Sequence, residues 1–231
     1  MMANSVANGI TTIGLYPFND IPEQHEFLKA CGINLFQFVE SGYSYRPDLL
    51  DEYYAGLRKE IESAQNDGFK VYIILLSNMA QWQGPEEQGS WVGLRTYPRD
   101  RAAMDRRISD LARAVRELKS ADGFTFFGGD PGGVPKSLGP ADIQDWIGMA
   151  REVRDVVAEN APGAEFNINP WAVTQWDDEG MDVFGAEFWL CETSNGKAIL
   201  QAEGLIGPGC GIEFCPHNYY RSLTLKIFAE A

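Results

Sequence analysis

Short apolar runs alternate with longer amphipathic segments along most of this chain. The runs have the length of β-strands, and the segments between them carry apolar residues at helical spacing, as in 99–120. The most apolar run, 69–77, is typical of a strand covered on both faces, as in a parallel sheet. The pattern predicts strands at 10–16, 33–40, 69–77, 124–129 and 165–169, helices at 21–31, 47–66, 99–120 and 141–160, and, after the alternation loosens, strands near 211–215 and 223–228 and a strand or helix start at 186–190.

Consecutive βα units build either an open doubly wound sheet or a closed barrel. A nucleotide-binding open sheet normally has a glycine-rich turn after its first strand, but residues 16–20 here contain no glycine. We therefore predict an α/β fold of the (β/α)8 TIM-type, with residues 1–231 forming a single catalytic-like domain. Because 231 residues are few for eight units with long loops, the barrel is expected to be incomplete or degenerate in its last quarter.

Polar and aromatic residues follow several predicted strands in succession. A barrel assembles its site from such positions, because all its strands direct their carboxyl ends to one face. Asn167, Asn169 and Trp171 alternate on one side of a strand, which suits the recognition of hydroxyl groups. The predicted substrate-binding residues are Tyr16, Asn78, Trp82, Trp91, Asn169, Trp171 and His217.

The long connection 78–98 contains Trp82 and Trp91. Long connections without regular structure are often functional, and indole rings stack on the C–H faces of sugars. We expect this segment to fold over the cleft and to carry both rings towards the ligand. The alternative is that both indoles pack beneath the segment and hold it to the barrel.

Glycoside hydrolysis needs two carboxyl groups on either side of the scissile bond, one as acid and the other as base or nucleophile. The candidates at predicted strand ends are Asp130, Glu40 and Glu213. Asp130 is the leading catalytic or substrate-orienting residue, with Glu40 or Glu213 as its partner. For Glu40 and Glu213, an ordinary capping or surface role fits the sequence equally well.

Residues 128–133 read Gly-Gly-Asp-Pro-Gly-Gly. The glycines either let the backbone approach a ligand closely or only turn the chain. A fourth strand ending Phe-Phe-Gly-Gly-Asp resembles the retaining hexosaminidases, whose fourth strand ends Gly-Gly-Asp-Glu, and more loosely other barrel glycoside hydrolases. By this resemblance Asp130 takes the place of the aspartate that orients the substrate acetamido group. The position of the general-acid glutamate falls on Pro131.

The chain has 33 acidic residues against 19 Lys and Arg, a net charge of −14. This acidic balance argues against nucleic acid or an anionic membrane as the partner and favours a neutral carbohydrate ligand. The beginning of the chain shows no signal-peptide pattern, so we expect a cytoplasmic protein. The sequence leaves the oligomeric state open.

No cofactor or metal is expected, because there are only two histidines and no paired metal-ligand motif. Cys210, Cys215 and His217 could bind zinc, and Cys215 with His217 could act as nucleophile and base, but both are minority interpretations. A sugar isomerase or aldolase would need a metal cluster or a buried lysine at a strand end. We therefore expect a glycoside hydrolase acting on a neutral or amino sugar glycoside, with a non-catalytic sugar-binding barrel as the alternative.

Overall fold

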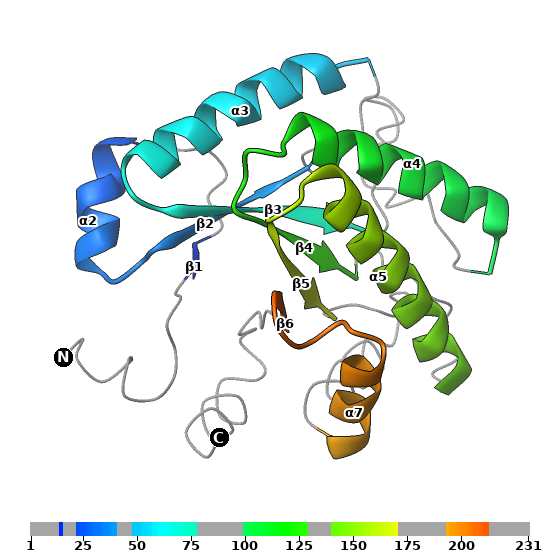
Figure 1. The fold of residues 1–231 in the computed structure, drawn as a ribbon. Coiled ribbons are helices and arrows are strands. Elements are labelled where there is room, and N and C mark those ends of the chain that lie inside the picture. Colours follow the sequence, from blue (N-terminus) through cyan, green and yellow to red (C-terminus); the bar gives the residue numbers. More distant parts are fainter. Residues whose placement is uncertain are drawn as a thin grey trace, which may run out of the picture.

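The computed structural model describes residues 14–15, 22–40, 48–77, 99–128, 140–170 and 193–212. Within these ranges six strands form one parallel sheet in the order β1-β2-β3-β4-β5-β6, with the helices between them (Figure 1). The elements are β1 (Gly14–Leu15), η1 (Pro22–Gln24), α2 (His25–Ala30), β2 (Leu35–Val39), α3 (Leu50–Asn66), β3 (Lys70–Leu76), α4 (Arg101–Glu117), β4 (Gly123–Phe127), α5 (Pro140–Asn160), β5 (Glu165–Asn169), α7 (Ser194–Ala202) and β6 (Cys210–Ile212).

The strand order distinguishes between the two predicted architectures. Every strand pairs in parallel with the next one along the chain, so the order never reverses. A doubly wound sheet requires such a reversal, because its helices must cover both faces. Figure 1 shows α3, α4 and α5 on one side of the sheet. The fold is therefore of the (β/α)-barrel type and, over the described residues, an incomplete barrel in which β1 pairs only with β2 and β6 only with β5.

The two faces of the sheet differ in character because alternate residues of a strand point to opposite sides. One set packs against the helices and forms the buried core. This core side holds Phe36, Phe38, Val71, Ile73, Leu75, Phe124, Phe126, Phe166 and Ile168. The strand registers place the other set together on the opposite side, here called the inner face: Gln37, Val39, Tyr72, Ile74, Thr125, Phe127, Asn167 and Asn169.

Helix α7 is the one described element that the sequence pattern did not predict. It is short and contains Gly196, which weakens both the apolar periodicity and the intrinsic helix preference. Its start is fixed by Thr193, whose hydroxyl accepts a hydrogen bond from the Gly196 N–H at 3.0 Å. The strand at 165–169 has the predicted bounds. The predictions at 186–190 and 223–228 lie outside the described residues.

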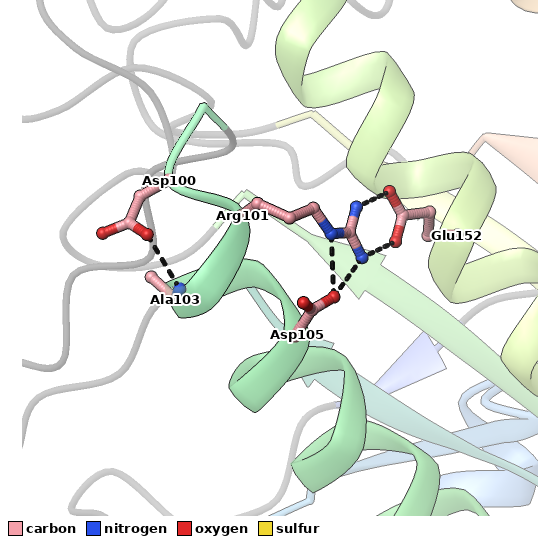
Figure 2. Close-up of polar contacts among 5 residues, drawn as sticks. All are labelled: Asp100, Arg101, Ala103, Asp105 and Glu152. Carbon is pink, nitrogen blue, oxygen red and sulfur yellow. Dashed lines mark hydrogen bonds and ion pairs between the residues drawn. The ribbon is translucent and has the colours of Figure 1, made fainter.

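Ion pairs join the outer surfaces of neighbouring helices. Figure 2 shows Arg101 of α4 between Asp105 of the same helix and Glu152 of α5, with two hydrogen bonds of 2.7 and 2.9 Å to Glu152. The hydrogen bonds that Arg101 donates to Glu152 and, to a lesser extent, to Asp105 raise the pKa of its guanidinium. The preceding Asp100 caps α4 by accepting from the Ala103 N–H at 3.0 Å. The Arg101 side chain is 60% exposed, so water screens these contacts.

Candidate functional site

The carboxyl ends of β3, β4 and β5 are held level with one another by backbone hydrogen bonds. The Ser77 N–H donates to the Phe127 carbonyl at 3.0 Å, and the Gly128 N–H donates to the Asn169 carbonyl at 3.2 Å. The Ser77 hydroxyl also donates to the Gly128 carbonyl. The sheet thus continues one residue beyond β3 and β4. The chain segments that were predicted to carry the site begin directly after these residues.

Two predicted polar residues of β5 share the inner face of the sheet. Asn169 is buried at the carboxyl end of the strand, and Asn167 lies one step deeper. The Asn167 Oδ1 lies so close to Gly211 of β6 that an added Cβ there would come within 2.5 Å of it. Gly211 therefore leaves room for the amide of Asn167. The two amides share one side of β5 as predicted, and their role in recognising a ligand stays a prediction.

Glu40 follows β2 directly and is fully buried. Its carboxylate oxygen Oε1 accepts hydrogen bonds from the Arg107 guanidinium and from the Leu76 N–H, the latter at 3.2 Å. Arg107 also donates to the Leu76 carbonyl from Nε at 3.0 Å and from Nη2 at 2.6 Å. Since Arg107 comes from α4, the Glu40 carboxylate lies on the core side of the sheet and not on the inner face. This placement favours a structural role for Glu40, and its catalytic role stays a prediction.

Arg107 was not among the predicted site residues. On α4 it falls in the buried stripe between Met104 and Leu111, at positions i, i+3 and i+7. A lone arginine in an apolar helical stripe needs a buried anionic partner, since an unpaired charge in the core is costly. That departure from the apolar pattern was the available signal, and Glu40 was the matching carboxylate.

A side chain of α3 also binds the end of β2. The Tyr53 hydroxyl of α3 donates to the Val39 carbonyl at 2.7 Å. Side chains from α3 and α4 therefore bind the chain where β2 and β3 end, in addition to the backbone bond from the Glu40 N–H to the Ile74 carbonyl.

A second polar cluster lies at the opposite, amino-terminal edge of the sheet. Glu165 of β5 accepts a hydrogen bond from Lys70 Nζ at 2.7 Å and another from the Tyr72 hydroxyl. The Lys70 and then the Tyr72 hydrogen bonds lower the pKa of the Glu165 carboxyl. Both donors come from β3 and reach across β4 at Gly123, where an added Cβ would lie 2.7 Å from a Tyr72 ring carbon. The glycine therefore makes the cluster possible.

The remaining predicted site residues lie outside the described residues. They are Tyr16, Asn78, Trp82, Trp91, Asp130, Trp171, Glu213 and His217. The hexosaminidase-like motif is described only at Gly128, and the connection 78–98 is not described. Among the described residues no group of three or more His, Cys, Asp and Glu is placed to hold a metal ion. No helix in the described ranges is long and apolar enough to span a membrane.

Comparison with protein-family models and with curated proteins finds no match. Among solved structures, the chain is similar to XEG5A, a GH5 xyloglucan-specific endo-beta-1,4-glucanase from a metagenomic library, in complex with cellotriose. That similarity has 15% identity and a TM-score of 0.47, over 66% of this chain and 47% of the other. Thermotoga maritima Cel5A in complex with cellobiose is 14% identical with a TM-score of 0.46, and the similarity covers 74% of this chain and 57% of that one. A Prevotella bryantii endo-beta-mannanase/endo-beta-glucanase is 13% identical with a TM-score of 0.46, and the similarity covers 76% of this chain and 29% of that one.

The chain spans about half the length of the first two of these proteins. Its class follows from its own strand order, since six parallel strands in sequential order define a barrel-type α/β protein. In such a protein the functional edge is the one at which the strands end.

Proposed function

We propose that this protein is a carbohydrate-active barrel, a glycoside hydrolase that acts on a neutral or amino sugar glycoside. The observation that carries the proposal is the level edge formed by Ser77, Gly128 and Asn169. Three segments rich in polar and aromatic residues leave from this edge, and barrel enzymes place their chemistry at such an edge. The acidic composition agrees with an uncharged ligand.

Asp130 and Glu213 are the proposed pair of reacting carboxyl groups. Asp130 comes two residues after Gly128 and Glu213 follows β6 directly in the sequence, and the parallel strands β4 and β6 that precede them end at the same edge of the sheet. Glu40 is a weaker candidate because Arg107 and Leu76 already bind its carboxylate on the core side. Trp82, Trp91 and Trp171 are the proposed stacking surfaces for sugar rings.

The test is a screen of aryl glycosides and oligosaccharides, with cellobiose and cellotriose among the probes. We expect wild-type turnover, and a fall of about 10²–10⁴-fold in Asp130→Asn and in Glu213→Gln with sugar binding retained. Asp110→Asn is the matched control, since Asp110 lies in the middle of α4. Its turnover should equal that of the wild type.

The second candidate, a sugar-binding barrel without catalysis, is favoured by Pro131, which stands where the resemblance places the general acid. In that case the wild-type protein binds oligosaccharides without cleaving them, and Asp130→Asn changes affinity alone. A protein that neither binds nor cleaves any sugar in the screen would contradict both candidates.

A further inference from the structure

We infer that Glu40 and Arg107 are a positioning pair, which binds the Leu76 N–H and carbonyl beyond the described end of β2 and thereby fixes the point where the chain leaves β3 towards the proposed site. The inference rests on the proposed function. It assigns a role to Arg107, which was not among the predicted site residues.

The first step is the hydrogen-bond ladder between β2 and β3. The two strands pair as far as Val39 and Ile74, and the last backbone bond runs from the Glu40 N–H to the Ile74 carbonyl at 3.1 Å. In a strand the N–H and C=O groups of alternate residues point to the same neighbour. Leu76 therefore directs its N–H and C=O towards β2, two residues beyond the point where the β2 ladder ends.

The side chains of Glu40 and Arg107 bind both backbone groups of Leu76, as a residue of a neighbouring strand would. A strand residue there would offer Leu76 one acceptor and one donor. The Glu40 carboxylate supplies the acceptor for the Leu76 N–H, and the Arg107 guanidinium supplies the donors for the Leu76 carbonyl. The two groups also bind each other.

The Glu40–Arg107 pair is buried. The Glu40 side chain is 2% exposed and that of Arg107 is 7% exposed, so their geometry is defined by packing and not by water. Buried ion pairs often add little net stability, because desolvation offsets their attraction. Their better-attested contribution is to specify one arrangement over others. Here that arrangement is the end of β3, directly before Asn78 and the segment with Trp82.

The experiment compares two double variants in the full chain. Glu40→Met with Arg107→Met removes both buried charges together, which is the change most compatible with folding. Arg101→Met with Glu152→Met is the matched control, because it removes the same residue types, one of them from the same helix, at the exposed pair of Figure 2. For each we would measure melting temperature, amide hydrogen exchange by NMR at Leu76 and Ile73, and the Kd for cellotriose.

For the buried pair we expect a melting temperature near that of the wild type, exchange at Leu76 about 10-fold faster with Ile73 unchanged, and a Kd about 10-fold weaker. The control should change none of these. Unchanged exchange at Leu76, or faster exchange with an unchanged Kd, would overturn the inference. If the wild-type protein binds no sugar, the proposed function fails, and exchange at Leu76 still decides whether the pair holds the end of β3.

Discussion

The two ends of β3 carry polar clusters that work in different ways. At the amino-terminal edge, Lys70 and Tyr72 reach across β4 to Glu165. The side chains of Lys70 and Glu165 are about half exposed. At the carboxyl-terminal edge, Glu40 and Arg107 are buried and bind the backbone of Leu76. The first cluster links side chains of two strands on a wet surface. The second binds the backbone of the last residue of a strand, next to the edge at which we propose the site.

The largest effect should come from removing one buried charge. Arg107→Met leaves the Glu40 carboxylate buried without its cation and the Leu76 carbonyl without its donors. We expect a loss of about 3–5 kcal/mol in the free energy of unfolding, measured by denaturant titration. Adding Glu40→Met should restore much of that loss, since the two changes are coupled. If Arg107→Met lowered the free energy of unfolding by less than about 1 kcal/mol, Arg107 would not be needed to compensate the buried Glu40 carboxylate.

The amino-terminal cluster depends on a residue without a side chain. Gly123→Ala places a Cβ 2.7 Å from a Tyr72 ring carbon and 3.0 Å from the Glu165 carbonyl oxygen, so the ring must move. The expected cost is about 1–3 kcal/mol, read from thermal or denaturant unfolding. Gly56→Ala on α3 is the control, because a Cβ there meets nothing within 4 Å and alanine favours helix. Equal stability of the two variants would show that Tyr72 does not need the space above Gly123.

A smaller, pH-dependent effect should follow from Glu165. Its hydrogen bonds to Lys70 and Tyr72 lower the carboxyl pKa in the folded state, so this group stabilises the fold above its unfolded pKa. That stabilisation is lost as the pH falls below the ordinary glutamate range and through the lowered pKa. Because the side chain is 47% exposed, the effect should stay under about 1 kcal/mol.

The measurement for Glu165 is unfolding stability from neutral to acidic pH for the wild type and Glu165→Gln. The difference between the two curves should be present at neutral pH and shrink as the solution becomes acidic. A gap that stays constant with pH would argue against the ionised carboxylate as its source.

The smallest effect should come from the exposed pair of α4 and α5. Arg101→Met removes contacts to Asp105 and Glu152 that water already screens. We expect a small change in melting temperature that disappears at about 1 M salt, where the screening length is ~3 Å. A change as large as that of Arg107→Met would remove the contrast between exposed and buried pairs.

The sequence was sufficient to predict the barrel-type alternation, because buried strands and amphipathic helices have distinct periods. It gave β5 with its observed bounds and placed Glu40 and Asn169 at strand ends, as the structure has them. The position of Arg107 in the apolar stripe of α4 indicates a buried anionic partner, but the choice of Glu40 among the carboxylates depends on how α4 packs on the sheet, which the pattern does not contain. Helix α7 was missed because its stability comes from a cap and from packing of Leu200, not from a long periodic stripe.

We propose that a carbohydrate site lies at the carboxyl-terminal edge of the sheet. The most direct measurement is hydrogen exchange by mass spectrometry, with and without the tightest-binding oligosaccharide of the screen. We predict protection confined to peptides that contain 15–21, 40–47, 77–98, 128–139, 169–192 and 212–217, with 67–70 and 161–165 at the other edge unchanged. Protection centred on 67–70 and 161–165, or no protection by any oligosaccharide tested, would contradict the account.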